Sequence, residues 1–285
     1  MTRYDNMQLG SYGGQVSQRQ DRPSRRNTRM KFATFNTNSV RTRLPILLEW
    51  LEKETPDILC LQETKVQDKD FPVEPLEKVG YHVTFRGQKS YNGVAILSKS
   101  PPEDGRLDLF SEGDDQARFI RVDIEGISVV NVYVPQGFQV GSEKFQYKLK
   151  WLKALLEYIV GHYTPGDSLI VAGDFNVAME DRDVYDPEAL RGGVGFHADE
   201  QALMKEFFHW GLEDVFRRHF PEGNHYTFWD YRIPSGFKRN IGWRIDYVLA
   251  TAPLAEKSRT AWVDMWARAL SKPSDHTFLV AEFDL

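Results

Sequence analysis

The most informative stretch of this sequence is Leu169-Ile170-Val171-Ala172-Gly173-Asp174-Phe175-Asn176. Its first four residues are apolar and two of them are β-branched, which predicts a buried strand. A carboxylate and a carboxamide, Asp174 and Asn176, follow with one residue between them, so an extended backbone would project both to the same side. Polar groups at the end of a buried strand, beside a glycine that allows close approach, are typical of a functional site.

Polar side chains of the same kinds stand at the ends of other strand-like runs. Working outward from the first stretch, they are Tyr133 after 127–132, Asp246 after Arg244-Ile245, Ser274-Asp275-His276 before 277–283, Glu63 after 58–62 and Asn36 after 31–35. Taken singly, each has a structural explanation, such as a turn or cap for Asn36 and Asp275, a solvated acid for Glu63, or an ion pair between Arg244 and Asp246. Tyr133 alone would be a half-buried sheet residue, and His276 alone a surface histidine. Their common place at strand ends favours one polar site over these separate explanations.

This set of side chains suits the hydrolysis of phosphate esters. Carboxylates with an amide oxygen and no thiol are hard ligands, which match Mg²⁺ or Mn²⁺ better than zinc. A histidine can stabilise negative charge on a phosphoryl oxygen or relay a proton, and an aspartate beside a carboxamide can orient and deprotonate water. The sequence has neither a Gly-x-x-x-x-Gly-Lys phosphate loop nor a dinucleotide fingerprint, which disfavours nucleotide-driven chemistry.

From residue 30 onward, apolar runs typical of strands alternate with stretches of helical period. One helix is predicted around Leu44, Leu47, Leu48 and Leu51, with Pro45 near its start. Another is predicted from Asp199 through Leu203 and Phe207 to Gly211. Between them, Ser142 is the predicted N-cap of a helix with an apolar stripe of Phe145, Leu149, Leu152, Leu156 and Ile159. Further strands are predicted at 57–61, 81–85, 93–97, 127–134, 168–172, 245–250 and 277–283. Because several strands follow one another without a helix, we expect residues 30–285 to form a single α/β domain of two packed mixed sheets.

Charge is distributed unevenly along the 285 residues. Residues 1–29 contain six arginines, two aspartates and almost nothing to bury, so we expect a disordered N-terminal tail. The remainder is more acidic than the net charge of −5 indicates, which disfavours nucleic-acid binding by bulk attraction. Binding to DNA would need a local basic strip or metal ions.

The single cysteine, Cys60, excludes an internal disulfide framework and a multi-thiolate zinc site, and its apolar surroundings predict a buried side chain. A reducing, cytoplasmic location follows from this cysteine usage. No apolar run approaches the roughly 18 residues of a membrane span, so we expect no membrane partner. The expected oligomeric state is a monomer.

In their order, the motifs resemble the exonuclease III family of DNA repair nucleases, which includes the apurinic/apyrimidinic endonucleases and belongs to the deoxyribonuclease-I-like superfamily. The matching pieces are Phe35-Asn36-Thr37-Asn38-Ser39-Val40-Arg41, Leu61-Gln62-Glu63-Thr64-Lys65, Tyr91-Asn92-Gly93-Val94-Ala95-Ile96-Leu97-Ser98, Asn131-Val132-Tyr133-Val134-Pro135, Gly173-Asp174-Phe175-Asn176, Phe228-Trp229-Asp230-Tyr231-Arg232, Gly242-Trp243-Arg244-Ile245-Asp246-Tyr247 and Ser274-Asp275-His276. One departure is Ser39, which stands where the family usually has glycine and fits if its backbone φ is below zero.

The resemblance implies a four-layer sandwich of two sheets flanked by helices, and a role for each matching residue. Glu63, Asn36 and Asp275 are the implied ligands of Mg²⁺ or Mn²⁺, with Asp174 and Asn176 as candidates for a second metal. Asp174 is implied to activate water and Asn176 to hold a phosphate oxygen. His276, oriented by Asp246, is implied to contact the phosphate, and Tyr133 to lie near the scissile bond.

A segment between 225 and 245 interleaves aromatic and basic residues, which is typical either of a nucleic-acid surface or of a core edge with its loop. The resemblance implies that Phe228, Trp243 and Ile245, with Trp229, form a pocket for an extruded abasic sugar, and that Arg232 lies near the DNA groove. Basic residues elsewhere form a candidate strip for phosphates: Lys65, Lys89, Arg118, Arg191, Arg232, Lys238, Arg239 and Arg244.

The expected function is therefore that of a metal-dependent DNA repair phosphodiesterase. Its implied substrate is duplex DNA with abasic sites or 3′-blocked ends, cleaved 5′ to the lesion or trimmed in the 3′–5′ direction, and in a bacterium it would be associated with the nucleoid. Two alternatives stay open at this point. One is a superfamily phosphodiesterase acting on a lipid or another small phosphate ester, and the other is a non-catalytic nucleic-acid-binding regulator on the same fold.

Overall fold

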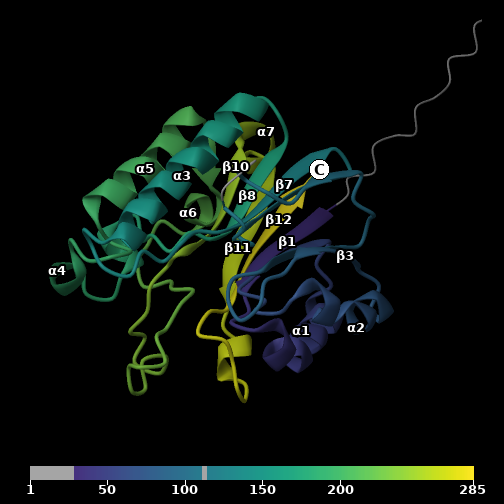
Figure 1. The fold of residues 1–285 in the computed structure, drawn as a ribbon, viewed down its shortest axis with the longest axis horizontal. Coiled ribbons are helices and arrows are strands. Elements are labelled where there is room, and N and C mark those ends of the chain that lie inside the picture. The colour runs from purple at the N-terminus through teal and green to yellow at the C-terminus, as the bar shows by residue number, and fades with distance from the viewer. Residues whose placement is uncertain (1–28, 111–113) are drawn as a thin grey trace, which may run out of the picture.

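The computed structural model describes residues 29–110 and 114–285, which form two six-stranded sheets packed face to face (Figure 1). In the first sheet the strands lie in the order β11 (Ser258–Asp264), β12 (Phe278–Asp284), β1 (Arg29–Asn36), β2 (Ile58–Gln62), β4 (Val94–Ser98) and β3 (His82–Arg86). In the second sheet the order is β5 (Asp104–Arg106), β6 (Phe119–Ile124), β7 (Ile127–Tyr133), β8 (Leu169–Asp174), β10 (Asp246–Thr251) and β9 (Leu212–Asp214).

Helices cover the outer faces of both sheets, so the molecule has four layers (Figure 1). The first sheet is covered by α1 (Val40–Glu54) and α2 (Val73–Lys78), and the second by α3 (Glu143–His162) and α5 (Ala198–Trp210). Shorter helices are α4 (Pro187–Leu190), α6 (Val215–His219) and α7 (Ala252–Ala255), with 3₁₀ turns at Asp68–Asp70, Asp181–Asp183 and Ala267–Ala269. This arrangement confirms the predicted fold class.

Strand β1 illustrates why the central strands are apolar along their whole length. Phe32 packs into the layer between the two sheets, whereas Ala33 and Phe35 pack against the helices of the outer layer. Cys60 lies in the inter-sheet layer, buried as predicted, and burial raises the pKa of its thiol. Because both faces of these strands are covered, alternation with polar residues is lost and an apolar run remains.

The predicted strands are all present, with boundaries displaced by one or two residues. Strands β5, β6, β9 and β11 were not predicted; β5, β9 and β11 are edge strands, and β6 lies next to the edge strand β5. Arg29 belongs to β1 instead of the expected tail, and the rest of that tail prediction, residues 1–28, falls outside the described residues. None of the helices within 29–110 and 114–285 has the length and apolarity of a membrane span.

The helix predictions are confirmed in position and corrected in detail. Ser142 caps α3 by accepting a hydrogen bond from the Phe145 amide, and α5 ends at Gly211 in a positive-φ conformation, as predicted. The cap of α5 is His197 and its first residue is Ala198, so the helix begins before Asp199. Pro45 lies inside α1, because the helix already starts at Val40.

Two buried amides join the sheets directly beneath the strand ends. Gln62 Nε2 donates to Asn131 Oδ1 at 2.7 Å, and Asn131 Nδ2 donates to the carbonyls of Leu61 and Ala95 at 2.9 and 2.8 Å. Gln62 precedes Glu63, and Asn131 lies two residues before Tyr133. These hydrogen bonds therefore fix how far β2 and β7 extend relative to each other along the strand direction, and with them the positions of Glu63 and Tyr133.

Candidate active site

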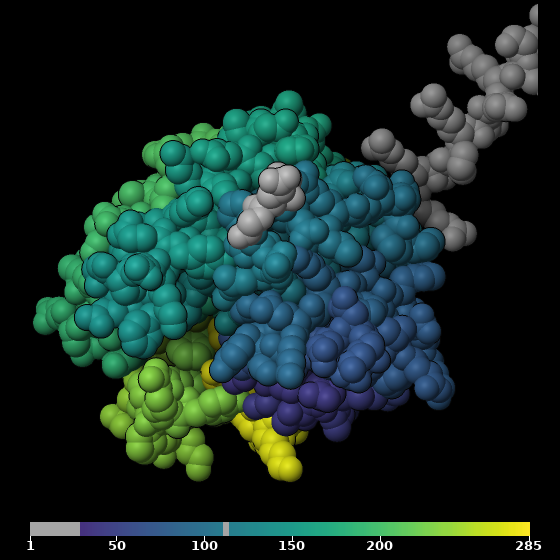
Figure 2. Space-filling model, viewed as in Figure 1, coloured from purple at the N-terminus to yellow at the C-terminus, as the bar shows by residue number. Residues whose placement is uncertain are grey.

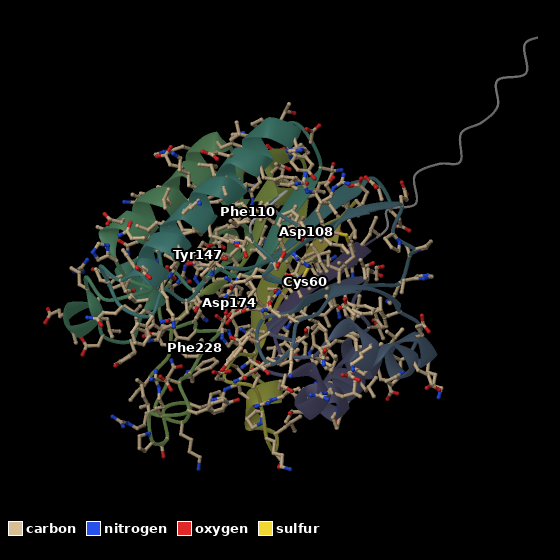
Figure 3. The ribbon with its side chains drawn as sticks, in the orientation of Figure 1. Cys60, Asp108, Phe110, Tyr147, Asp174 and Phe228 are labelled. Carbon is tan, nitrogen blue, oxygen red and sulfur yellow. The ribbon has the colours of Figure 1, made fainter. Side chains whose placement is uncertain are left out.

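One edge of the sandwich collects the polar strand ends. Strands β1 and β2 are parallel, as are β7 and β8, whereas β12 and β10 run antiparallel to their neighbours β1 and β8. The carboxyl ends of four strands and the amino ends of two therefore meet at this edge. A cleft of about 560 Å³ opens there. Figure 3 shows Asp174 near the centre of the molecule with Phe228 below it, and Figure 2 shows the yellow-green segment that precedes β10 protruding at the lower side of this face, beside the yellow segment near the C-terminus.

Asp174, His276 and Asp246 form a buried chain of an acid, an imidazole and an acid. His276 Nδ1 is 2.8 Å from Asp246 Oδ2, and its Nε2 is 3.7 Å from Asp174 Oδ2. Burial by itself would lower the imidazole pKa, but the negative charges of Asp246 and Asp174 raise it to about 10. The histidine is therefore an imidazolium at neutral pH.

Burial is also the main cause of an unusual acidity at Asp174. It raises the pKa of this carboxyl to about 7, with a further increase from Asp246, against the lowering effect of the His276 charge. The carboxyl oxygens accept hydrogen bonds from Asn36 Nδ2 at 2.9 Å and from the backbone N–H of Asn176 at 2.8 Å. Asp174 is thus poised to exchange a proton near neutral pH.

Glu63 is the second carboxylate of the cleft and lies across from Asp174. Tyr133 donates its hydroxyl to Oε1 at 2.5 Å, and the Lys65 ammonium is 2.6 Å from Oε2. Burial would raise the pKa of Glu63, but Lys65 and the Tyr133 hydrogen bond outweigh it, so the pKa lies below its usual value. Glu63 follows β2 in a left-handed conformation (φ 48°), which turns the chain sharply at the strand end.

Asn36 joins the two halves of the cleft. Its Nδ2 donates to Asp174 Oδ2 at 2.9 Å and to Glu63 Oε1 at 3.3 Å, while its Oδ1 accepts from the Asn38 amide at 3.0 Å. The buried carboxylate of Asp174, the half-buried carboxylate of Glu63 and the Asn36 amide form a hard-oxygen set that fits a divalent cation such as Mg²⁺ or Mn²⁺. A positive group, Lys65, already contacts the outer oxygen of Glu63.

Asp275 reaches the same set through residues that sequence reasoning did not single out for this role. Asn38 donates Nδ2 to Asp275 Oδ1 at 2.9 Å and accepts from Lys65 Nζ at 2.5 Å. A hydrogen-bonded chain therefore runs from Asp275 through Asn38 and Lys65 to Glu63. Asn38 and Lys65 both lie within the motifs quoted above, each two residues after a predicted site residue. This closeness in sequence to Asn36 and Glu63 was the signal that could have identified them.

A different trio has the spacing of a metal site. Ligand atoms of Asp174, Asp246 and His276 lie within 4.8 Å of one another. An imidazolium whose pKa is raised to about 10 has no free lone pair at neutral pH, and its Nδ1 is already bonded to Asp246. The trio is better suited to moving protons than to binding a cation, and the assignment of the metal to Asn36, Glu63 and Asp275 stays a prediction.

The remaining catalytic candidates also lie at the cleft. Tyr133 and Asn176 line it, and Asn176 has a left-handed backbone (φ 53°) and donates Nδ2 to the Val134 carbonyl at 3.0 Å. Burial and the nearby acids raise the pKa of the Tyr133 hydroxyl well above its usual value, so it stays protonated. Ser39 departs from the expectation, because its φ is 92° and lies in the region that favours glycine.

The apolar wall of the cleft contains Phe228, Trp243 and Ile245, together with Leu190, Val194 and Ile233. The Phe228 ring lies 4.9 Å from the His276 ring, so the wall directly adjoins the polar groups. Trp229 does not line this cleft: it is buried, packs edge-on against Phe237 at 5.2 Å and faces a separate cavity of about 440 Å³.

Four of the basic candidates fall into three groups. Arg232 is exposed at the cleft and pairs with Asp230. Arg118 stacks on the Tyr133 ring at 4.6 Å and lines an adjoining cavity of about 490 Å³, and the exposed Lys89 lies in the β3–β4 loop beside this cavity. Arg244 is buried and binds Asp183 and Asp214 at 2.7 Å, so it is neither a phosphate ligand nor the partner of Asp246.

Comparisons with known proteins place this geometry among nucleases. Residues 33–276 match the model of the endonuclease/exonuclease/phosphatase family. Exodeoxyribonuclease III of Haemophilus influenzae is 37% identical over 267 residues, which cover 89% of this chain and 100% of the relative. An AP endonuclease from Archaeoglobus fulgidus superposes with a TM-score of 0.87 at 46% identity, and a 3′ phosphatase from Neisseria bound to a product DNA hairpin superposes with 0.86 at 39%. Both structural superpositions cover 90% of this chain and 100% of the other protein's chain.

Proposed function

Because this chain belongs to the endonuclease/exonuclease/phosphatase family, we propose that it is a metal-dependent DNA repair nuclease that cleaves duplex DNA 5′ to abasic sites and cleans 3′ ends. The observation that carries the proposal is the pair of unlike carboxylates, Glu63 and Asp174, joined through Asn36 at the edge of a cleft with an apolar wall. The finer assignments, namely the ion, the lesion and the residue roles, are part of the proposal, and the contacts in the cleft support them.

In the proposed mechanism Asp174 is the general base. With a pKa near 7, its carboxylate can accept a proton from a water molecule as that water attacks the phosphorus in line with the leaving 3′ oxygen. Asn36 and the Asn176 amide hold the carboxylate oxygens, so the base has a fixed orientation during the transfer.

His276 and the Glu63 half of the cleft act on the phosphate. The His276 imidazolium, held through Nδ1 by Asp246, can donate Nε2–H to a phosphoryl oxygen as charge accumulates there. Glu63, with Asn36 and Asp275, would hold the divalent cation. When bound, Mg²⁺ or Mn²⁺ supplies Lewis-acid stabilisation of the negative phosphate.

The apolar wall supports abasic DNA as the substrate. Phe228 and Ile245 have no hydrogen-bonding group and Trp243 has only its indole N–H, so this wall offers little to the edge of a base, and the Phe228 ring adjoins the His276 ring. A flipped sugar without its base can occupy such a pocket, whereas a normal nucleotide would place a base against the wall. All residues of the site come from one chain, which supports a monomer as the active form.

A single assay tests the proposal. One duplex carries an abasic site and a second is undamaged and blunt, and each is incubated with Mg²⁺ or with EDTA. We expect metal-dependent incision 5′ to the lesion in the first duplex, and the product lengths separate incision from resection of ends. Hydrolysis of phospholipid or inositol phosphate without DNA cleavage would favour the lipid phosphodiesterase, and DNA binding without metal-dependent cleavage would favour the regulator.

A further inference from the structure

Lys148 on α3 and Glu200 on α5 form an ion pair beneath the cleft, and neither side chain has any exposed surface. Burial lowers the pKa of Lys148, and Glu200 offsets part of this effect. A buried pair of opposite charges is no more stabilising, in general, than apolar side chains of the same shape. The two residues take no part in the mechanism above, so their contacts indicate what else they do.

Lys148 binds the backbone of two loops that form the cleft. Its Nζ donates to the Asn176 carbonyl at 2.7 Å and to the Gln136 carbonyl at 3.3 Å. Asn176 is held from both ends, because its own amide donates to Asp174 Oδ1 at 2.8 Å. The left-handed conformation of Asn176 (φ 53°) costs free energy, and these two hydrogen bonds oppose its relaxation.

Glu200 binds a third loop of the cleft. Its carboxylate accepts from the amides of Gly195 and His197 at 2.9 and 3.1 Å. The Gly195 carbonyl in turn accepts from the Ala178 amide at 2.6 Å, which ties this loop to the one that carries Asn176. Gln136, Asn176 and Gly195 all line the cleft, so one buried pair contacts three of its walls.

We propose that Lys148 and Glu200 are positioning residues, which set the backbone at Asn176 and through it the orientation of the Asp174 carboxylate. The proposal rests on the proposed function, in which Asp174 and Asn176 act on water and phosphate. Lys148 supplies the hydrogen bonds to the Asn176 loop, and Glu200 fixes Lys148 and holds the Gly195 loop. Neither side chain touches the substrate.

The decisive variant is the double substitution Lys148→Met with Glu200→Gln. It removes both charges together, so no unpaired charge is left buried, and the glutamine oxygen can still accept from Gly195. The donor to the Asn176 carbonyl is lost. We expect kcat on abasic duplex to fall by about 10- to 100-fold while KM changes by less than about threefold, because misorientation affects the reacting groups more than DNA binding.

A matched control exists at the far end of β1. Lys31 Nζ also donates to a carbonyl, that of Glu54 at 2.8 Å, and to the Glu54 carboxylate at 3.2 Å. The double substitution Lys31→Met with Glu54→Gln therefore removes the same chemistry away from the cleft. We expect it to lower the melting temperature with kcat unchanged.

Amide hydrogen exchange supplies a readout that does not depend on activity. In Lys148→Met/Glu200→Gln, peptides covering 174–178 should exchange faster than in the wild type, and in the control pair they should not. Glu200→Gln alone serves if the double variant does not fold: it weakens the hold on Lys148, so kcat should fall with KM nearly unchanged and exchange at 174–178 should rise, both by less than in the double variant. A kcat loss no greater than that of the control pair, or unchanged exchange at 174–178, would overturn the proposal. Failure of the wild type to cleave abasic DNA would instead refute the proposed function, and the exchange experiment would still test the positioning.

Discussion

Glu63 and Asp174 lie on different sheets, face the same cleft and share one donor, Nδ2 of Asn36. Their surroundings differ in charge. Glu63 contacts the Lys65 ammonium and the Tyr133 hydroxyl, which keep its pKa low, whereas Asp174 is enclosed with a second acid and an imidazolium, and burial raises its pKa to about 7. Two carboxylates of one cleft therefore have different protonation behaviour because their burial and their charged neighbours differ.

This difference separates two tasks that phosphodiester hydrolysis requires. A carboxylate that stays ionised can hold a cation at any physiological pH. A carboxyl group that titrates near neutrality can take a proton from water and return it. The Glu63 half is thus suited to binding metal, and the Asp174 half is suited to moving protons.

The largest expected effect follows from replacing the proton acceptor. Asp174→Asn keeps the shape and the contact to Asn36 but removes the base, so kcat should fall by about 10⁴-fold in a single-turnover incision assay. Circular dichroism and the melting temperature should be preserved or improved, because a buried carboxyl becomes a neutral amide. Activity within tenfold of wild type would remove Asp174 from the role of base.

Replacing the other carboxylate, Glu63, is expected to lower kcat somewhat less. Glu63→Gln should lower kcat by about 10³-fold at a fixed metal concentration, because the ionised ligand is lost. A higher concentration of Mg²⁺ or Mn²⁺ should restore part of the activity of Glu63→Gln. It should restore none of the activity that Asp174→Asn loses. If metal rescued both variants equally, the division of tasks between the two halves would be wrong.

The link between His276 and Asp246 should be visible in the pH profile. Asp246 raises the imidazole pKa, so Asp246→Asn should lower it and move the alkaline limb of kcat toward lower pH. At pH 7.5 we expect a loss of about 10²-fold. An alkaline limb at the wild-type position would show that the His276 charge is not needed.

The smallest effect concerns stability, measured as urea unfolding of the metal-free protein in EDTA. The folded pKa of Asp174, about 7, lies above the usual value of 3.8, so its contribution is lost as pH rises from about 4 to 7. Asp174→Asn should lack this loss, and the two proteins should diverge by on the order of 3 kcal/mol between pH 4 and 7. Glu63→Gln should show the opposite sign, because a lowered pKa stabilises the fold above pH 4.5 and the gain disappears in acid. Parallel curves for all three proteins would contradict the assigned surroundings.

The residues at the cleft were predictable because most of them end strands that are covered on both faces. Such strands read as apolar runs, and a polar residue at the end of the run stands out, as Asp174 and Glu63 do. Strand β6 was missed although Arg121 and Asp123 alternate with its apolar residues, because the prediction rested on continuous apolar runs. Strands β5 and β9 contain only three residues each, too few for a pattern.

Partners distant in sequence were harder to predict. The neighbouring Arg244 suggested itself for Asp246, but Arg244 binds Asp183 and Asp214, and Asp246 binds His276, 30 residues away. The buried face of α3 is rotated from the predicted stripe: Lys148 and Leu155 are buried, whereas Leu149 and Leu156 are only partly so. A lysine such as Lys148 on the buried face of a helix cannot be inferred from apolar periodicity, because that pattern assigns every charged residue to the exposed face.

The pairing of β12 with β1 has a consequence for the synthesis of the protein. His276 and Asp275 precede the last strand, which inserts between β1 and β11. A nascent polypeptide that has not reached this strand has an unpaired edge on β1 and lacks His276, the imidazole between Asp174 and Asp246. The growing chain is therefore expected to be harmless to nearby DNA until translation of the domain is complete.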